Sequence, residues 1–402
     1  MTTNSPVDVS FVMPCLNESA TLVQCIDAAK QAIARLETDF GMSGEILIAD
    51  NGSTDGSQDL ARSAGALVVD IKERGYGAAL RGGIAASRGR FIVMGDSDMS
   101  YDFRQAVPMI EKLRDGDDLC MGSRFKGEIL PGAMPWKNRY IGNPVLSAIL
   151  RLLFRTAISD SHCGLRGITR EAFDDLKLTA NGMEFASEMV LKAALRRLKT
   201  SEVPVTLSPD GRGRPPHLSP WRDGFRHLFY MLMLSPSWLY LLPSAILYVV
   251  GFTILVNLLA NPGGNMVQIG RIQIGDHWTV VGASSLIIAT QTVIFWLATQ
   301  ITGIRSGYFP ATPTINRVLE HSTLGTWILA GLGVGTLGFV WVASIAAGWI
   351  YSGFGPLEQM RPLITAFTAV VIGAQLFFGG FLLSIVAGNK LRHRVSVSPD
   401  HT

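Results

Sequence analysis

Long apolar stretches in the second half of the chain constrain its fold more strongly than any other feature. Between Pro236 and Gly388 the sequence contains no lysine, and its few other charged residues separate four apolar runs. A helix of about 20 apolar residues is long enough to cross the ~30 Å hydrocarbon layer of a bilayer. The four runs cover residues 236–260, 278–302, 324–350 and 362–387. The sequence therefore predicts an α-helical transmembrane domain over residues 236–390.

The basic residues around these runs predict the orientation of the chain in a membrane. Most of them lie before the first run, between the second and third, and after the fourth: Arg222, Arg226, Arg305, Arg317, Lys390, Arg392 and Arg394. The other two loops contain only Arg271 and Arg361. Loops rich in arginine and lysine stay in the cytoplasm, and the start MTTNSPVDVS lacks the pattern of a secretory signal. We therefore expect an integral membrane protein, with residues 1–217 and the tail 391–402 in the cytoplasm.

Residues 1–217 show strand-like and helix-like patterns in alternation. Apolar runs typical of buried strands occur at residues 7–14, 45–50, 66–71 and 90–96. Helical spacing of apolar residues lies between them, and this alternation is typical of an α/β domain with a parallel sheet. Ligands of such sheets bind beyond the carboxyl ends of the strands. Three of these ends carry the polar clusters PCLNE, ADNGSTD and GDSDMS, so the sequence predicts a binding site where they meet.

The charge balance gives no indication of a nucleic-acid partner, and the cysteine spacing gives none of a functional thiol site. The chain carries 35 Lys+Arg and 32 Asp+Glu, and its formal net charge of +3 gives no reason to expect nucleic acid as a partner. The four cysteines lack CxxC spacing and all fall in the part expected in the cytoplasm: Cys15, Cys25, Cys120 and Cys163. We expect them to be reduced thiols without a functional role.

The stretch GDSDMSYD places Asp96, Asp98 and Asp102 just after an apolar run. Close carboxylates repel one another unless a cation, a proton or water relieves them. A lone DxD pair is more often a solvated turn, but two other polar clusters are expected at the same sheet edge. Mg²⁺ or Mn²⁺ takes one or two protein carboxylates and completes its shell with phosphate oxygens and water. We therefore expect Asp96 and Asp98 to hold a metal that bridges to a diphosphate, and Asp102 to cap a helix.

Two further features of this half suit a ligand with a nucleobase, a phosphate or a sugar. Asp50 and Asn51, at the end of a strand, can accept from and donate to the edge of a nucleobase, although Asp50 fits equally well as the cap of the next helix. In ERGYGAALRGGI the glycines fail the GxGxxG spacing of a dinucleotide site. A glycine-rich helix start with Arg81 suits a backbone that passes close to a phosphate or a sugar.

Taken in order, these motifs resemble a known family. The segments VMPCLNE, ADNGSTDGS, ERGYGAALRGG, GDSDMSYD, GSRF and DSHCGLRG resemble glycosyltransferase family 2, whose fold is GT-A, over residues 7–230. The similarity is strongest to polyprenyl-phosphate sugar synthases of the dolichol-phosphate mannose synthase and polyprenyl-phosphate glucosyltransferase type. It implies inverting transfer of a hexose from UDP-hexose or GDP-mannose to a polyprenyl phosphate, giving a lipid-linked sugar for cell-envelope glycoconjugates.

Matching the family's motifs position by position implies which residues hold the nucleotide sugar. They are Pro14, Leu16, Glu18, Asp50, Asp96, Ser97, Arg212 and, as a near-equivalent of the last, Arg214. Leu16 replaces a tyrosine that the family often has, and Ser100 stands where relatives often have a further metal ligand. Asp96 and Asp98 match the metal motif, which implies Mg²⁺ or Mn²⁺ as the cofactor.

The resemblance also implies the residues that meet the acceptor. Arg124, Arg139 and Asn143 match positions that hold its phosphate, and arginine forks suit phosphate oxygens. A phosphate monoester has a second pKa of about 6, so it is already largely a nucleophile and needs no strong base. Asp160 matches a family aspartate with a catalytic role, either as a general base or in orienting the acceptor or Arg166.

Two other groups of polar residues are expected to be structural. His162 suits packing or a sugar contact better than metal binding, because no second histidine or cysteine lies at ligand spacing. Glu184 and Glu188 fall four residues apart on one helix, where like charges repel unless they are paired. We expect salt bridges from nearby arginines.

Two segments before the first predicted span are amphipathic and could lie at a membrane surface. Leucine and phenylalanine alternate with arginine in residues 143–159 and 219–236, as in helices that lie in the headgroup layer. The alternative is ordinary packing against the sheet. We assign residues 218–235 as an interfacial juxtamembrane segment. The spans themselves serve as an anchor, and their many glycines allow close helix packing or contacts in a homo-oligomer.

Two rival functions remain open. A processive polysaccharide synthase of the same family typically adds a QxxRW motif, which this sequence lacks. The second rival is a non-catalytic membrane protein that only binds a nucleotide sugar. Such a protein does not need residues that stabilise a leaving group, so the presence of Asp96, Asp98, Arg124 and Arg212 argues against it.

Overall fold

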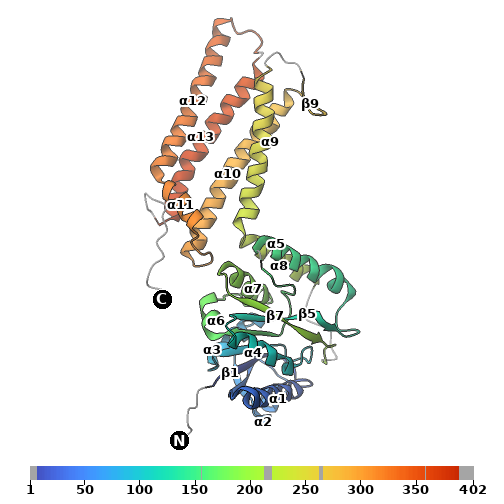
Figure 1. The fold of residues 1–402 in the computed structure, drawn as a ribbon. Coiled ribbons are helices and arrows are strands. Elements are labelled where there is room, and N and C mark those ends of the chain that lie inside the picture. Colours follow the sequence, from blue (N-terminus) through green and yellow to red (C-terminus); the bar gives the residue numbers. More distant parts are fainter. Residues whose placement is uncertain (1–6, 155, 212–219, 262–265, 358, 389–402) are drawn as a thin grey trace. The chain divides into compact units, whose positions relative to one another are not determined.

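The computed structural model describes residues 7–154, 156–211, 220–261, 266–357 and 359–388 (Figure 1). The chain divides into two compact units, Met1–Met231 and Leu232–Thr402. Sequence patterning sets the expected cytoplasmic domain at 1–217, and the first unit continues beyond that point to include most of helix α8, Pro220–Met233.

The first unit is built on a seven-stranded sheet in the order β3-β2-β1-β4-β6-β5-β7. The strands are β1 Val9–Cys15, β2 Gly44–Asp50, β3 Leu67–Asp70, β4 Phe91–Met94, β5 Leu119–Ile129, β6 Arg166–Thr169 and β7 Thr200–Leu207. The four strands expected from the sequence pair in parallel, but β6 runs antiparallel to β4 and β5. The sheet is therefore mixed and not purely parallel. Strand β6 has the sequence RGIT, whose one large apolar residue is Ile168, so it lacks the apolar run that marks β3 and β4.

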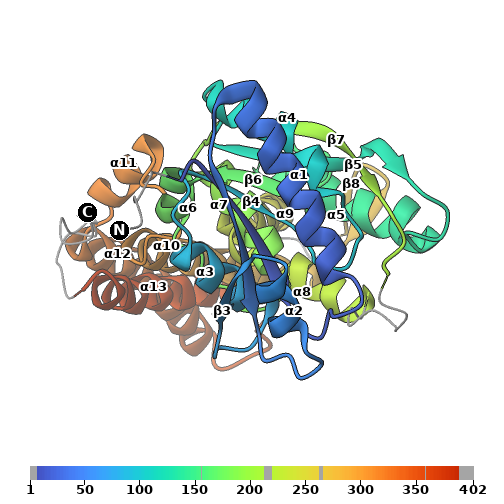
Figure 2. The ribbon, with the colours of Figure 1, turned by 90° about the horizontal axis from the view of Figure 1, so that it is seen from below.

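Helices cover both faces of this sheet. They are α1 Leu22–Phe40, α2 Ser57–Ser63, α3 Tyr76–Ala86, α4 Val107–Arg114, α5 Asn143–Phe154, α6 Arg170–Leu176, α7 Phe185–Leu195 and α8. In Figure 2, α1 and α4 lie on one side of the strands and α3 on the other. Alternate β1 side chains such as Phe11 pack with α1 and α4 in one buried core, whereas Val12 packs on α3. This alternation follows from the two-residue repeat of a strand. Each large apolar side chain fully buried in these layers contributes roughly 1.5–3 kcal/mol.

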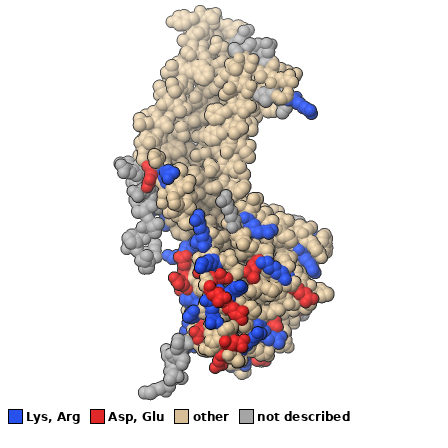
Figure 3. All heavy atoms as spheres, in the orientation of Figure 1, with Lys and Arg blue, Asp and Glu red and all other residues tan. Residues whose placement is uncertain are grey.

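The second unit contains four helices long and apolar enough to cross a membrane: Ser237–Leu259, His277–Arg305, Leu324–Tyr351 and Met360–Val386. They comprise α9 with the turn before it, α10, α12 and α13. Between 17% and 44% of the most apolar window of each helix is buried, so much of its apolar surface faces outward. Charged side chains cover the first unit in Figure 3 and are nearly absent from the visible face of these helices. An apolar surface of this kind is suited to the hydrocarbon layer of a bilayer.

Two smaller features complete this unit. A short hairpin, β8 Val267–Ile269 and β9 Ile272–Ile274, follows α9, and helix α11, Pro313–His321, lies between α10 and α12 in the sequence. Glycines set the contact of α12 with α13, because a Cβ on Gly373 would lie 2.4 Å from the amide nitrogen of Gly335. The expected close helix packing is thus present. The fold class predicted from the sequence, an α/β domain of GT-A type followed by four apolar helices, is confirmed.

Candidate active site

The polar clusters predicted at the strand ends meet at one edge of the sheet. Strand β1 lies between β2 and β4 and is parallel to both, and Cys15 at its end is in register with Asp50 at the end of β2. The amide of Asn17 donates to Ser53 Oγ at 2.9 Å, and the amide of Thr54 donates to Asn17 Oδ1 at 2.8 Å. These bonds connect the first two clusters, and we call the edge of the sheet that they form the rim.

The third cluster joins the same rim through Ser97. Its hydroxyl donates to the carbonyl oxygen of Pro14 at 2.7 Å, and its own carbonyl oxygen accepts from Thr21 Oγ1 at 2.8 Å. Glu18 is buried beside them, and its amide donates to Ser57 Oγ. Leu16 is 37% exposed, so an apolar side chain faces solvent at this edge. The structure therefore gathers the predicted residues Pro14, Leu16, Glu18 and Ser97 in one place.

Asp50 lies fully buried at the floor of this edge. Its Oδ2 accepts from the amides of Gly52 and Ser53 at 3.0 and 3.1 Å and from Gln58 Nε2 at 2.6 Å. Burial alone would raise the pKa of Asp50, but these hydrogen bonds outweigh it and hold the pKa below its usual value. Helix α2 begins after Gly56, so Asp50 stabilises the turn before the helix and is not its cap.

Asn51 has a different role from the predicted nucleobase contact. Its Nδ2 donates to the carbonyl oxygens of Ile71 and Glu73 at 3.0 and 2.7 Å, and its Oδ1 accepts from the amide of Gly75. Both amide hydrogens of Asn51 are thereby committed to the backbone. We correct the prediction: Asn51 fixes the segment that leads into α3.

The glycine-rich start of α3 also differs from the prediction. A Cβ on Gly77 would lie 2.3 Å from the carbonyl oxygen of Ala180, and one on Gly75 would lie 2.1 Å from that of Asn181. The close approach that glycine permits is therefore to the protein's own backbone and not to a phosphate. Arg81 donates to Glu73 Oε2 at 3.3 Å and to Asn181 Oδ1. These hydrogen bonds stabilise the packing of α3 on residues 180 and 181.

The aspartates after β4 occupy distinct environments. Asp98 is 4% exposed and its Oδ1 accepts from the amide of Ser100 at 2.9 Å, whereas Asp96 is half-buried. Asp102 accepts from the amide of Arg104 at 2.9 Å and caps the 3₁₀ turn Phe103–Ala106. The predicted capping role of Asp102 is confirmed. Asp96 and Asp98 thus lie at the same edge of the sheet as Glu18 and Asp50.

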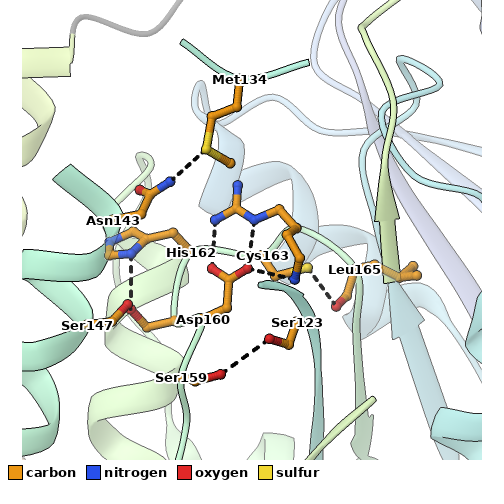
Figure 4. A network of polar contacts seen from close by, with 12 residues as sticks. Ser123, Met134, Asn143, Ser147, Ser159, Asp160, His162, Cys163 and Leu165 are labelled. Atoms are coloured by element: carbon orange, nitrogen blue, oxygen red, sulfur yellow. Dashed lines mark hydrogen bonds and ion pairs between the residues drawn. The ribbon is translucent and has the colours of Figure 1, made fainter. Parts of the chain in front are cut away.

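A second centre lies where β5 meets the loop before β6 (Figure 4). Arg124 donates from Nε and Nη2 to the two carboxylate oxygens of Asp160, both at 2.7 Å, and its amide donates to Asp160 Oδ2 at 2.9 Å. The Asp160 side chain is fully buried and that of Arg124 is 9% exposed. The Glu202 carboxylate fixes the position of this loop, because it accepts hydrogen bonds from the amides of Ser159 and Asp160.

This geometry revises the roles considered for Asp160. Both of its oxygens accept hydrogen bonds from the Arg124 guanidinium, so the two planar groups hold each other in one orientation. Arg166, which the sequence offered as its partner, donates instead to the carbonyl oxygens of Cys163, Ala186 and Ser161. Asp160 therefore orients Arg124 and not Arg166.

The other residues expected to hold the acceptor phosphate lie on the segment that leads into α5. Asn143 begins α5, and its Nδ2 donates to Met134 Sδ at 3.5 Å. Figure 4 shows Asn143, His162 and Asp160 in the same small region. Arg139, one turn before Asn143, is half-buried with its guanidinium 5.5 Å from the centre of the Tyr140 ring. Arg212 and Arg214 lie outside the described residues.

His162 packs in the interior of this region. Its Nδ1 lies 3.0 Å from Ser161 Oγ, and its ring stands edge-to-face with His227 at 4.9 Å. Burial, and then the charges of His227 and Arg124, hold the pKa of His162 well below its usual value, so the ring is neutral. The contact with His227 comes from α8 and could not be found from sequence spacing.

Glu188 is paired with a lysine and not with an arginine. It accepts from Lys192 Nζ at 2.8 Å and from the amides of Thr179 and Ala180, and both charged side chains are at most 3% exposed. Lys192 is four residues further along α7, so helical spacing alone could have identified it. Burial would raise the pKa of Glu188, but Lys192 and the two amides hold it below its usual value.

We expect Lys192→Met to lower the free energy of unfolding by about 3–5 kcal/mol, because it leaves Glu188 charged and unpaired in the interior. Lys30→Met is the matched control, since Lys30 forms an exposed pair with Asp27 that contributes about 0–1 kcal/mol. Thermal unfolding of the detergent-solubilised full chain measures both. Equal shifts for the two variants would contradict the assignment.

Comparison with known proteins identifies the family. The low-salt glycan biosynthesis hexosyltransferase Agl6 of Haloferax volcanii is 36% identical over 382 residues, which cover 93% of this chain and 88% of Agl6. The chain belongs to glycosyltransferase family 2. The family model for glycosyl transferase family 2 matches residues 10–177, and that for the family's C-terminal transmembrane region matches residues 297–387.

Two shorter relatives support the same assignment. Glycosyltransferase AglJ of Haloferax volcanii is 34% identical over 221 residues, covering 55% of this chain and 69% of AglJ. The dolichyl-phosphate hexose transferase of the same organism is 30% identical over 200 residues, covering 49% of this chain and 82% of that protein. The family resemblance predicted from the order of motifs is confirmed, and the protein is a membrane glycosyltransferase related to dolichyl-phosphate hexose transferases.

Proposed function

We propose that this family 2 enzyme moves a hexose, with inversion, from UDP-hexose or GDP-mannose to a polyprenyl phosphate. The product is a lipid-linked sugar that serves as a donor for cell-envelope glycoconjugates. The second unit spans the inner membrane of a bacterial cell, and the first unit is in its cytoplasm. The observation that carries this proposal is the presence in one unit of two complementary centres, the carboxylates Asp96 and Asp98 and the buried Arg124–Asp160 pair.

The carboxylate edge suits the donor. Asp96 and Asp98 follow β4, beside the ends of β1 and β2 where nucleotides bind in sheets of this kind. Pro14, Leu16 and Glu18 line the same rim, with Asp50 beneath them holding the turn at residues 52 and 53. We assign the nucleoside diphosphate of the donor to this rim.

A divalent cation fits the residues at this edge. Within the residues that the structure describes, no group of three or more His, Cys, Asp or Glu side chains is arranged to hold a metal. Mg²⁺ and Mn²⁺ in phosphate-transfer sites need only one or two carboxylates, because phosphate oxygens and water complete the shell. Asp96 and Asp98 would hold the ion. When bound, it supplies positive charge that stabilises the departing diphosphate.

The Arg124–Asp160 centre suits the acceptor. Asp160 occupies Nε and Nη2 of Arg124, and Nη1 lies outside that fork. A phosphate oxygen of the lipid forms the bond to the anomeric carbon while the bond from that carbon to the diphosphate oxygen breaks, and the electron pair leaves with the nucleoside diphosphate. The attacking phosphate is already ionised near neutral pH. Asp160 is therefore needed to orient Arg124 and not to remove a proton.

The surface near Asn143 suits a bilayer that delivers the acceptor. The segment from Trp136 to Leu152 exposes five large apolar side chains, between 49% and 68% each: Trp136, Tyr140, Ile141, Val145 and Leu152. Lys137, Arg139 and Arg151 lie on the same segment, which gives it the mixed apolar and basic character of a helix at a headgroup layer. This supports the interfacial placement of residues 143–159 over packing against the sheet.

The proposal is tested by incubating the full chain in membranes with undecaprenyl phosphate and, in separate reactions, UDP-glucose, UDP-galactose and GDP-mannose. We expect one donor to yield a nucleoside diphosphate and a new organic-soluble sugar phosphate lipid of the corresponding mass. A water-soluble polymer would instead show a processive polysaccharide synthase. Binding of a nucleotide sugar without turnover would show a non-catalytic protein, and either result would overturn the proposal.

A further inference from the structure

Strand β5 is irregular at the point where it carries Arg124. It pairs with β7 before and after residues 124–127, and its register shifts between Ser123 and Glu128. Residues 124–127 therefore form a bulge. A Cβ at Gly127 would lie 2.2 Å from the carbonyl oxygen of Val205, so glycine lets the bulge lie close against β7. Bulges are common next to active sites, because they change the direction of a side chain.

Side-chain oxygens accept hydrogen bonds from two amides of the bulge. The amide of Arg124 donates to Asp160 Oδ2 at 2.9 Å, and the amide of Lys126 donates to Ser123 Oγ at 3.3 Å. Asp160 thus binds Arg124 through its backbone as well as through its guanidinium. The direction of that guanidinium therefore depends on the position of the loop that carries Asp160.

Glu202 of β7 determines where this loop lies. Its Oε1 accepts from the amides of Ser159 and Asp160 at 2.6 and 3.0 Å, and its Oε2 accepts from Ser159 Oγ at 2.8 Å. The Glu202 side chain is 3% exposed, and Lys126 Nζ lies 2.7 Å from Oε2. A buried amide that loses its acceptor costs about 1–3 kcal/mol, so the loop is bound to the carboxylate.

The reach of the Glu202 side chain is what this arrangement uses. The loop also contacts β5, since Ser123 Oγ lies 3.3 Å from Ser159 Oγ, and Figure 4 shows both serines beside Asp160. A carboxylate one methylene shorter at position 202 would lie about 1.5 Å from its present place. Either the two amides would lose their acceptor or the loop would move with it. In both cases the position of Asp160 is no longer fixed.

We propose that Glu202 is a positioning residue for the lipid acceptor. Through the loop at residues 159 and 160 it sets the direction in which Arg124 presents Nη1 to the acceptor phosphate. The inference rests on the function proposed above and adds a residue that the motif comparison did not assign. A displacement of about 1 Å at a reacting centre can lower the rate about 100-fold, even when the mutation is far from the chemistry.

The test compares two conservative variants of the full chain in nanodiscs with undecaprenyl phosphate and the nucleotide sugar that the wild type uses. Glu202→Asp keeps the charge and shortens the reach, whereas Glu202→Gln keeps the reach and loses the charge. We expect Glu202→Asp to lower kcat/KM for the lipid acceptor by about 100-fold, with KM for the nucleotide sugar unchanged.

Glu202→Gln should keep most of the wild-type kcat/KM for the acceptor. A glutamine oxygen can still accept from the amides of Ser159 and Asp160. The substitution removes the ion pair with Lys126, whose side chain is 53% exposed, and a pair of this kind contributes about 0–1 kcal/mol. Hydrogen exchange of residues 156–163 provides a second measurement. The amides of Ser159 and Asp160 should exchange faster in Glu202→Asp than in Glu202→Gln.

The matched control is Glu45→Asp, the same change at the amino end of β2. Glu45 is 8% exposed and accepts from the amide of Arg88 at 2.6 Å and from Ser10 Oγ at 2.7 Å, so its contacts resemble those of Glu202. It has no contact with the loop of Asp160 among the hydrogen bonds of the described residues. We expect wild-type kinetic constants for both substrates from this variant.

The outcomes separate this inference from the proposed function. If Glu202→Gln loses acceptor kcat/KM and Glu202→Asp keeps it, charge matters instead of reach and the positioning role is wrong. If both variants lose affinity for donor and acceptor alike, Glu202 is only structural. The proposed function stands in both cases. If the wild type transfers no sugar to the lipid from any donor, the proposed function fails and the inference fails with it.

Discussion

Asp98→Asn is expected to reduce sugar transfer by about 1,000-fold or more, because it removes a carboxylate from the metal centre that we propose for the leaving diphosphate. The substitution is conservative for the fold. An asparagine oxygen can still accept the hydrogen bond that the Ser100 amide gives to Asp98 Oδ1, and the side chain keeps its volume. Binding of Mn²⁺ should weaken in parallel with turnover, which is measured by release of nucleoside diphosphate.

The matched control is Asp102→Asn, the same change four residues further along the chain. Asp102 caps a 3₁₀ turn through the Arg104 amide, and asparagine caps about as well as aspartate. We expect near wild-type turnover from this variant. If Asp98→Asn and Asp102→Asn lose activity equally, the loss would reflect local charge or folding, and Asp98 would not be a ligand.

Residues that lie close in the chain, or at the ends of neighbouring strands, were predictable from the sequence. Strand periodicity placed Asp50 and Asp96 at the ends of apolar runs, and parallel pairing then brought those ends to one edge. The capping role of Asp102 followed from its position before Phe103. These predictions needed only the repeat of a strand and the chemistry of a helix start.

Contacts between residues that are far apart in the sequence could not be predicted from periodicity or from helix-start chemistry. Asp160 and Arg124 are separated by 36 positions, and no periodic pattern relates them. The antiparallel strand β6 brings the loop of Asp160 beside β5, and its sequence RGIT has no apolar run from which that pairing could be predicted. The glycines of α3 were assigned to a phosphate because sequence shows that a close approach is possible but not what approaches. Lys192 is different, since its spacing from Glu188 was visible and an arginine was expected instead.

The structure also joins features that the sequence left separate. Glu188 and the glycines at the start of α3 occur in two distant segments, and the contacts of residues 179–181 connect them. Rigid support of this kind is what a site needs when electrostatic stabilisation of a leaving group depends on fixed charges. The helices and glycines outside the rim therefore contribute to the chemistry by limiting how the rim can move.

Arg124→Lys is expected to lower kcat/KM for the lipid acceptor by about 100-fold or more, because lysine cannot bind a carboxylate and a phosphate at once through a planar fork. KM for the nucleotide sugar should change little. Arg88→Lys is the matched control: Arg88 also forks onto a buried carboxylate, with Nε and Nη2 at 2.9 and 2.8 Å from Glu45 Oε2, but it lies at the amino ends of the strands. It should leave the kinetics unchanged.

Asp160→Asn then decides between positioning and base catalysis. If Asp160 only orients Arg124, the variant should lose kcat/KM for the acceptor, keep the shape of the pH–rate profile, and add no further loss when combined with Arg124→Lys. If Asp160 removes a proton, the acidic limb of the profile should shift or vanish and the two losses should multiply. We expect the first result, because the structure commits both oxygens of Asp160 to Arg124.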